Sequence, residues 1–310
     1  MFVPPLQPEF AHLAEFDMGT GFGSADFDLE GMRDAIASFI TPPPPVDGVR
    51  HEVIVLDAEA GVTADLFAPT GPGPHPVLVW FHGGGYVIGS SALDSHRMQA
   101  WTQRLGCVTV SVDYRLAPEH PYPAAHHDAR RALDWVVDAA ADLEIDPARI
   151  VVGGASAGGG VAAGLVLAAR DQGTPLAGQL LVYPMIDDRQ VTASNGWAAA
   201  VWSEASNAYG WRSYLGSASG TDVPAYAAAA RSEDLDGLPP TLLLVGGSDR
   251  FFDEDLTYAT RLTHAGVPTE VHVYPAAPHG FDLVAPEATT SVAATADAER
   301  WLADVFAVRP

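Results

Sequence analysis

The stretch Arg149-Ile-Val-Val-Gly-Gly-Ala-Ser-Ala-Gly158, with the small-residue segment that follows it to Arg170, decides the fold of this chain. A short apolar run leads into Gly154-Ala-Ser156-Ala-Gly158, and the residues beyond favour a helix, so we expect Ser156 at a strand-to-helix turn. Such a turn leaves almost no room for side chains two positions before and after the serine. It also places the hydroxyl at a helix N-terminus, where developing negative charge is stabilised. A plain glycine-rich turn is the alternative, because the 310 residues include 30 glycines.

A second glycine-rich segment follows another expected strand. Residues 76–81 form a continuous apolar run typical of a buried strand, and His82-Gly83-Gly84-Gly85-Tyr86 comes directly after it. Three consecutive glycines free several backbone N–H groups to point at one place, which is what an oxyanion hole requires. An anion-binding nest and an ordinary loop are the alternatives.

Two further side chains follow expected strands in the last quarter of the chain. Asp249 comes just after the apolar run 241–245, and His279 comes shortly after the alternating segment 270–274. Open α/β sheets place their sites at the carboxyl ends of their strands. The order Ser156, Asp249, His279 is the order of a hydrolytic triad on an α/β-hydrolase sheet.

Each of these two residues also has a simpler interpretation. Asp249, together with the acidic residues 253–255, could be the acidic first turn of a helix or a site for a hard metal ion. His279 alone could be an ordinary loop histidine. The joint occurrence of both residues after strands, and in triad order, favours the catalytic interpretation.

Together these motifs resemble those of the hormone-sensitive-lipase-like group of α/β-hydrolases, also called bacterial family IV esterases. His82-Gly-Gly-Gly85 is similar to the HGGG motif of that group, and Gly154 to Gly158 is similar to its serine turn. Asp113-Tyr-Arg-Leu-Ala-Pro-Glu119 with Pro121-Tyr-Pro-Ala124 resembles the DYRLAPE and P-x-P-A signature, and His279-Gly280-Phe281 resembles the histidine motif. The resemblance extends from about Val46 to the C-terminus.

The resemblance implies a role for each matching position. It makes Ser156 the nucleophile, His279 the general base and Asp249 the acid that orients the histidine. The implied oxyanion donors are backbone N–H groups, those of Gly84, Gly85 and Ala157. The implied supporting motif residues are His82, Gly83, Gly154 and Gly158.

Two positions depart from the pattern of this group. An acidic residue usually precedes the serine, and here Ala155 stands there. The acid motif usually reads D-P-L, and here it reads Asp249-Arg250-Phe251. Neither change removes a triad member, but both alter the local support of the site.

Composition excludes several other classes of protein. The net charge of −23, from 16 basic and 39 acidic residues, argues against nucleic-acid and anionic-membrane partners. The chain contains no lysine, which excludes a Ser–Lys dyad, a Schiff-base enzyme and a Walker A lysine. The single Cys107 permits no internal disulfide, and its apolar surroundings favour a core position. We expect no metal and no cofactor.

The expected partner is a small-molecule ester. The N-terminus lacks the pattern of a signal peptide, and no apolar run is long enough to span a bilayer. We therefore expect a cytoplasmic protein without membrane insertion, and a homodimer is left open.

The pattern along the chain predicts one α/β core with a cap. Strands and helices alternate through residues 46–185 and 238–310, as expected for an α/β-hydrolase fold with a mostly parallel sheet and helices on both faces. Residues 1–45 contain a helical stripe over 26–40, which by the resemblance belongs to the cap, and a Pro-rich connector. Residues 186–237 break the alternation and, by the resemblance, form a cap insertion.

Aromatic residues beside the expected catalytic loops are candidates for the walls of a substrate pocket. They are Tyr86, Trp202 and Trp211. The alternative is that these aromatic side chains only stabilise a surface insertion.

The sequence thus predicts a serine carboxylesterase acting on short- to medium-chain acyl esters. An amidase, a lactonase or an acyltransferase would use the same triad, because the acyl-enzyme chemistry is shared. A ligand-binding protein without catalysis, as among the plant hormone receptors of this group, is a further alternative. Such receptors typically lose the histidine that His279 supplies here.

Overall fold

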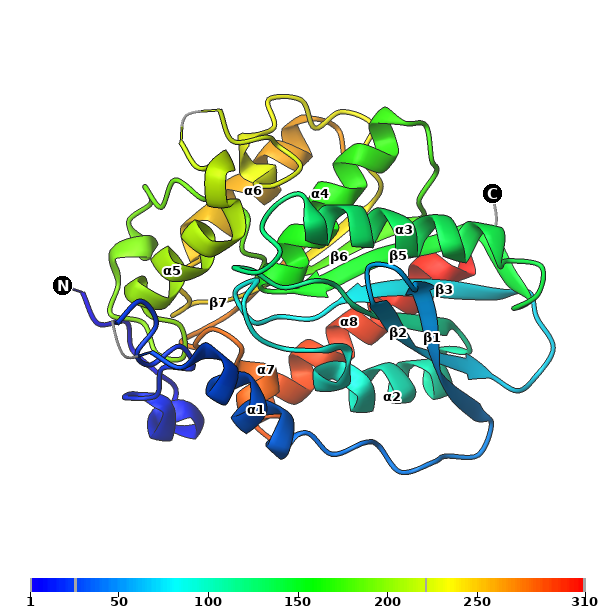
Figure 1. The fold of residues 1–310 in the computed structure, drawn as a ribbon, viewed down its shortest axis with the longest axis horizontal. Helices are drawn as coiled ribbons and strands as arrows, with labels where there is room; N and C mark the ends of the chain where they lie inside the picture. The colour runs from blue at the N-terminus through cyan, green and yellow to red at the C-terminus, as the bar shows by residue number, and fades with distance from the viewer. Residues whose placement is uncertain (1, 25–26, 221, 309–310) are drawn as a thin grey trace.

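The centre of the computed structural model is one sheet of eight strands in the order β1-β2-β4-β3-β5-β6-β7-β8 (Figure 1). The structure describes residues 2–24, 27–220 and 222–308. β2 is antiparallel to both β1 and β4, and every other neighbouring pair is parallel. The strands are β1 (Val49–Asp57), β2 (Val62–Pro69), β3 (His75–Phe81), β4 (Val108–Asp113), β5 (Ile145–Ala155), β6 (Gly178–Val182), β7 (Thr241–Gly246) and β8 (Thr269–Tyr274).

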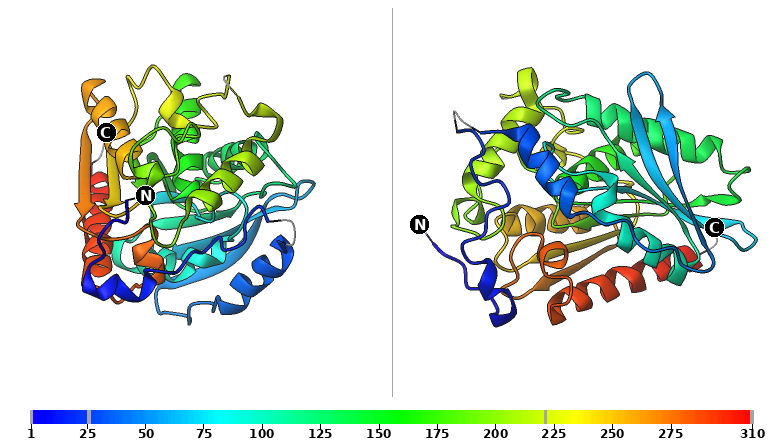
Figure 2. Two further views of the ribbon diagram at one scale, coloured as in Figure 1. Left: turned by 90° about the vertical axis from the view of Figure 1, so that its left-hand side faces the viewer. Right: turned by 60° about the horizontal axis from the view of Figure 1, so that its bottom comes forward.

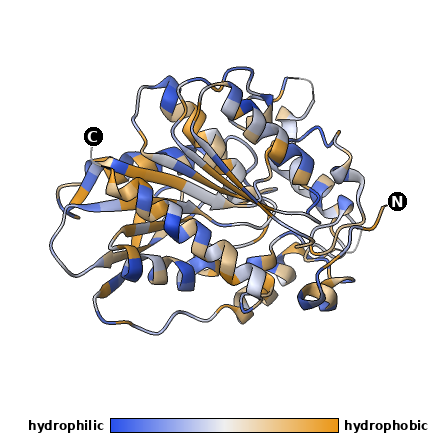
Figure 3. Ribbon diagram, turned by 180° about the vertical axis from the view of Figure 1, so that it is seen from behind, coloured by the Kyte–Doolittle hydropathy of each residue, from blue (hydrophilic) through white to orange (hydrophobic). Residues whose placement is uncertain are grey.

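The apolar runs of the sequence are the inner parallel strands. β6 and β7 are buried along their whole length, and β3 is buried from its second residue on. Such strands need no alternation of polar and apolar residues, because helices cover both faces of the sheet. Figure 3 shows these strands as an apolar layer between helices that carry both polar and apolar residues.

Helices lie on both faces of the sheet. α2 packs against β2 and β4 and touches α8, whereas α4 packs against β3, β5 and β6 and touches α3 on the opposite face (Figure 1). α6 packs against β7 and β8. The helices are α1 (Leu29–Phe39), α2 (Ser95–Leu105), α3 (Ala124–Asp138), α4 (Ala157–Asp171), α5 (Glu204–Leu215), α6 (Phe252–His264), α7 (Phe281–Val284) and α8 (Thr289–Ala307). The short 3-10 helices are η1 (Pro8–Leu13), η2 (Ser91–Asp94), η3 (Ser194–Gly196), η4 (Gly216–Ala218) and η5 (Ala229–Arg231).

The predicted fold class is therefore confirmed: this is an α/β-hydrolase fold with a mostly parallel sheet. Residues 1, 25 and 26 of the expected N-terminal part, residue 221 of the expected insertion and residues 309–310 of the expected core lie outside the described residues. Within the described ranges, no helix combines the length and the apolar character needed to cross a membrane.

Two segments far apart in sequence meet at the end of the sheet where the parallel strands finish. Both views of Figure 2 place the N-terminal segment beside the residues around α5. An isolated bridge joins Asp17 to Val201, with the Met18 N–H donating to the Val201 carbonyl at 2.8 Å and the Val201 N–H donating to the Phe16 carbonyl at 2.6 Å. The Asp17 carboxylate also accepts a hydrogen bond from the Ser206 hydroxyl at 3.0 Å. The N-terminal segment is thus joined to the expected cap insertion by backbone and side-chain hydrogen bonds.

Candidate active site

Ser156 sits at the sharp turn between β5 and α4. Its backbone has φ 55° and ψ −120°, a conformation that non-glycine residues rarely adopt and that marks functional sites. The Ser156 N–H donates to the Val182 carbonyl at 2.9 Å, which holds the turn against β6. A Cβ on Gly154 would lie 2.3 Å from the Gly158 carbonyl oxygen, and a Cβ on Gly158 would lie 2.0 Å from the Phe81 carbonyl oxygen. There is therefore no room for a side chain at Gly154 or at Gly158.

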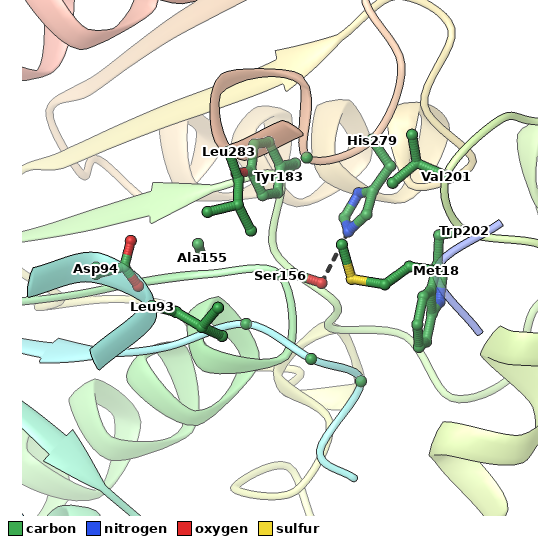
Figure 4. A pocket seen from close by; sticks show the side chains of 14 residues that line it. Met18, Leu93, Asp94, Ala155, Ser156, Tyr183, Val201, Trp202, His279 and Leu283 are labelled. Atoms are coloured by element: carbon green, nitrogen blue, oxygen red, sulfur yellow. Dashed lines mark hydrogen bonds between the residues drawn. The ribbon is translucent and has the colours of Figure 1, made fainter. Parts of the chain in front are cut away.

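His279 and Asp249 reach Ser156 from the segments that follow β8 and β7. Asp249 follows β7, and His279 lies between β8 and α7. His279 Nε2 lies 2.8 Å from Ser156 Oγ, and His279 Nδ1 lies 2.7 Å from Asp249 Oδ2 (Figure 4). The other carboxylate oxygen of Asp249 accepts the Phe251 N–H at 2.9 Å. The structure thus brings the three predicted residues into one buried chain of hydrogen bonds.

In this series of hydrogen bonds, donors and acceptors are ordered as nucleophilic catalysis requires. A carboxylate can only accept, so the proton between His279 and Asp249 belongs to Nδ1, and Nε2 is left as the acceptor that faces the Ser156 hydroxyl. In that tautomer Nε2 can take the hydroxyl proton as the oxygen attacks a carbonyl carbon. Asp249 then stabilises the imidazolium ion that forms.

The loop 82–85 lies beside the serine and leaves backbone donors free. Gly84 has φ 122° and Gly85 has φ 59°, and a Cβ on Gly84 would lie 2.0 Å from the Ile88 carbonyl oxygen. Within the described part of the chain, neither of their N–H groups donates to another residue. Ala157 is the first residue of α4, where the helix itself offers its N–H no acceptor. These three donors are available to an oxyanion beside Ser156.

His82 supports this loop from the side away from the cavity. Its ring is buried, contacts the Gly83 carbonyl through Nδ1 at 2.7 Å and stacks on Tyr114 at 4.3 Å between ring centroids. The Tyr114 hydroxyl donates to the His82 carbonyl at 2.8 Å. Burial lowers the pKa of His82, which keeps the ring uncharged.

A cavity of about 40 Å³ lies over Ser156, and we call it the catalytic pocket. Its lining includes Ser156, His279 and the glycines 83–85. Its remaining side chains are Met18, Leu93, Asp94, Ala155, Tyr183, Val201, Trp202 and Leu283 (Figure 4). Trp202, one of the predicted wall residues, is among them. Met18, Val201 and Leu93 were not expected from the sequence.

The structure places the other two predicted wall residues, Tyr86 and Trp211, behind the wall. Neither lines the catalytic pocket. The Tyr86 hydroxyl donates to the Met185 carbonyl at 2.8 Å, and its ring stacks on Tyr214 at 3.9 Å between centroids. The Trp211 ring lies 5.4 Å from that of Tyr86. These aromatic side chains fill the core between α5 and the glycine loop, because large apolar rings gain most by complete burial.

Arg250 has a role that the sequence did not reveal. Its side chain is fully buried and donates to three carbonyls of the cap insertion, those of Asn195, Trp197 and Trp202. The bonds to Trp197 and Trp202 are both 3.1 Å long. Burial lowers the pKa of Arg250. Arg250, which follows Asp249, therefore fastens the expected cap insertion to the core beside the candidate site.

The acidic residues 253–255 form the first turn of α6, as one of the two alternatives predicts. Asp253 Oδ2 accepts the Ser194 N–H at 2.8 Å, and Glu254 Oε2 accepts the Asn195 side-chain amide at 3.0 Å. Burial raises the pKa of Glu254 to about 8 and the pKa of Asp255 well above its ordinary range. Within the described ranges, no cluster of three His, Cys, Asp or Glu side chains could hold a metal ion.

Comparison with known proteins agrees with this geometry. Residues 78–283 match the family described as the alpha/beta hydrolase fold. Esterase LipI of Mycobacterium tuberculosis is 38% identical over 269 residues, which cover 83% of this chain and 82% of that protein. Carboxylesterase NlhH of the same organism is 37% identical over 281 residues, which cover 86% of this chain and 87% of that protein. The solved structure of a bacterial heroin esterase has a TM-score of 0.88 at 36% identity and covers 98% of this chain and 99% of that chain. The chain belongs to the α/β-hydrolase family, within its hormone-sensitive-lipase-like group.

Proposed function

We propose that this protein is a serine carboxylesterase that works through an acyl-enzyme intermediate. Ser156 Oγ attacks the ester carbonyl carbon while His279 Nε2 accepts the hydroxyl proton. The N–H groups of Gly84, Gly85 and Ala157 stabilise the negative charge that develops on the carbonyl oxygen. His279 then gives its proton to the departing alcohol, and the acyl group stays on Ser156.

The second half of the reaction reverses these roles. A water molecule gives a proton to His279 Nε2 as its oxygen attacks the acyl carbon, and the oxyanion donors act again. The carboxylic acid leaves when Ser156 Oγ recovers the proton from His279. Each proton that His279 accepts is returned, so the enzyme ends as it began.

The observation that carries this proposal is the hydrogen-bond chain from Ser156 Oγ through His279 to Asp249, with distances of 2.8 and 2.7 Å, at the floor of a cavity. The names of the similar proteins, esterase and carboxylesterase, support the ester as the substrate class. An amidase, a lactonase or an acyltransferase would use the same hydrogen bonds between Ser156, His279 and Asp249. No contact among the described residues of the site favours one of these activities.

We further propose that short to medium acyl chains, of roughly two to eight carbons, are preferred. The support is the small catalytic pocket, about 40 Å³, which is closed on one side by Val201 and Trp202. Each methylene contributes about 0.8 kcal/mol only while it finds apolar room, so acyl carbons that do not fit inside the catalytic pocket gain nothing from that pocket.

The experiment combines covalent labelling with kinetics. A fluorophosphonate probe is expected to label the wild type and to leave Ser156→Ala unlabelled. On p-nitrophenyl esters, Ser156→Ala and His279→Ala are each expected to lower kcat by about four to six decades, because the two residues act as a unit. If purified Ser156→Ala kept more than about a tenth of the wild-type kcat, the proposed nucleophile would be wrong.

A further inference from the structure

A second and much larger hollow adjoins the catalytic pocket. It has a volume of about 710 Å³ and lies between α1 and the loop that follows β3. We call it the acyl groove. Its most apolar lining comes from Phe16, Met32, Ile36, Phe39 and Ile88. A cavity of about 150 Å³ already accommodates benzene, so the groove has room for far more than the small pocket over Ser156.

The two hollows share one boundary. The residues that line both are Gly83 and Gly84, which have no side chains, and the apolar side chains of Met18, Leu93 and Leu283. Figure 4 shows these three side chains around Ser156, with the Met18 thioether beside the dashed line from Ser156 to His279. The three side chains therefore form the constriction through which one hollow communicates with the other.

Met18 is the member of this constriction best suited to move. Its backbone is fixed, because its N–H donates to the Val201 carbonyl and the neighbouring Asp17 is bonded to Ser206. Its side chain is only partly buried and has three rotatable bonds around a soft thioether, so it can change rotamer without moving the cap. A side chain of this kind on a fixed backbone can open and close a passage.

The chemistry of the reaction indicates which part of an ester lies toward the constriction. The departing alcohol must lie near His279 to receive its proton, and the carbonyl oxygen must face Gly84 and Gly85. His279 and its neighbours Val201 and Trp202 line the catalytic pocket but not the acyl groove. The acyl chain must therefore extend in the remaining direction, past Leu93 and Leu283 toward the acyl groove.

The lining of the acyl groove also suits an uncharged acyl chain. Two titratable side chains line it, Asp17 and His96, and both are already hydrogen-bonded within the protein. Asp17 accepts from Ser206, and His96 Nε2 lies 3.0 Å from the Thr41 carbonyl oxygen. Both groups are thus engaged within the protein, and the Asp17 carboxylate, whose hydrogen-bond donors are uncharged, disfavours an anionic acyl group.

We propose that Met18 is a gate that sets the acyl-chain specificity of the enzyme, and that aliphatic acyl chains too long for the catalytic pocket extend past it into the acyl groove. This inference rests on the proposed esterase function. The gate admits medium chains when the Met18 side chain turns away from Leu93 and Leu283. Short acyl groups fit without opening it.

The test measures the ratio of kcat/KM for p-nitrophenyl octanoate to kcat/KM for p-nitrophenyl acetate. Met18→Ala widens the passage and is expected to raise this ratio by about fivefold. Met18→Phe fills the passage with a stiff ring and is expected to lower the ratio by about tenfold, the loss of room for roughly two methylenes. Opposite shifts for the two variants are the specific signature of a gate.

Two further variants separate the gate from nonspecific damage. Ile36→Ser makes the groove wall polar without touching the constriction, and it is expected to lower the same ratio. Val191→Ala changes a side chain that is 74% exposed and lines neither hollow, so it is expected to leave the ratio within about twofold. Circular dichroism confirms that each variant is folded before its kinetics are compared.

A parallel series of acetate esters, with linear alcohols of increasing length, tests the assignment of the acyl side. If the Met18 variants changed only the alcohol-length profile, the groove would bind the alcohol and the proposal would be overturned. If they changed neither profile, Met18 would not be a gate. If the wild type hydrolysed no ester of either series, the proposed function itself would fail.

Discussion

Replacing Arg250 by methionine is expected to loosen the cap more than it damages the core. Arg250→Met keeps the length and apolar stem of the side chain but removes all three hydrogen bonds to the carbonyls of Asn195, Trp197 and Trp202. A buried carbonyl without a donor costs about 1–3 kcal/mol. Among the residues that the structure describes, no carboxylate forms an ion pair with Arg250, so its removal also recovers part of the cost of burying a charge.

We therefore expect Arg250→Met to lower the free energy of unfolding by about 3 kcal/mol, less than the sum of three lost bonds. Urea unfolding followed by tryptophan fluorescence measures this difference. Because Trp202 lines the catalytic pocket, displacement of its backbone should also lower kcat/KM by about ten- to a hundredfold. Arg250→Lys should recover little, since one ammonium group cannot reach three carbonyls as a planar guanidinium does.

Arg104→Met is the matched control for this experiment. Arg104 pairs with Glu299 at 2.6 Å, but its side chain is 60% exposed, so its loss should cost less than about 1 kcal/mol and leave kcat/KM unchanged. The reasoning would be refuted if Arg250→Met unfolded at the same urea concentration as Arg104→Met. It would also be refuted if Arg250→Lys were as stable and active as the wild type.

Two other predictions concern acidic residues around the site, and a third concerns metal ions. Asp249→Asn should lower kcat by about four decades because the imidazole loses the acceptor that fixes its tautomer, whereas Asp253→Asn should change it far less; greater sensitivity at Asp253 would mean that the acid was assigned to the wrong position. Glu254 has a pKa of about 8 in the folded protein, against an ordinary value of 4.5, so the folded state retains a proton that the unfolded chain has released. Stability should therefore fall as pH rises through that window, and urea unfolding at several pH values should show a shallower fall for Glu254→Gln; equal slopes would contradict a buried protonated acid. Because the proposed mechanism uses no metal ion, dialysis against EDTA should leave esterase activity intact, and a loss restored by one divalent metal would point back to the carboxylates around Asp249.

The parts of the fold that the sequence predicts best are those with a strong local pattern. The apolar runs 76–81 and 241–245 became β3 and β7 with nearly the same bounds, because continuous apolar strands are buried on both faces. The bounds of α8 (Thr289–Ala307) were not predicted, because the buried stripe of its first half consists of the small residues Ser291, Ala294 and Ala298, which give a weak apolar signal. Its position depends on the sheet that it covers.

The candidate site likewise contains residues that the sequence predicts and residues that it does not. Ser156, Asp249 and His279 lie in short motifs after strands, so their approach follows from the topology of a parallel sheet. The residues that close the pocket, Met18 and Val201, belong to segments that meet only in the folded protein. Aromatic character alone also failed to separate Trp202, which lines the pocket, from Trp211, which is buried behind it. An aromatic ring suits a core as well as a substrate wall, and only the backbone path decides between them.

The anchoring of the cap explains why specificity should be concentrated in few side chains. Asp17 fixes the N-terminal segment to α5 through Ser206, and Arg250 fixes the cap insertion to the core. The Arg250 anchor holds backbone carbonyls, and the Asp17 anchor joins two side chains that do not line the catalytic pocket, so the outline of that pocket is set before a substrate arrives. What can still vary is the side chain at the constriction, where Met18 points toward Ser156 (Figure 4). A single substitution there can change the range of accepted acyl chains while Ser156, His279 and Asp249 and their supports stay in place, whereas a substitution at Arg250 should affect every ester alike.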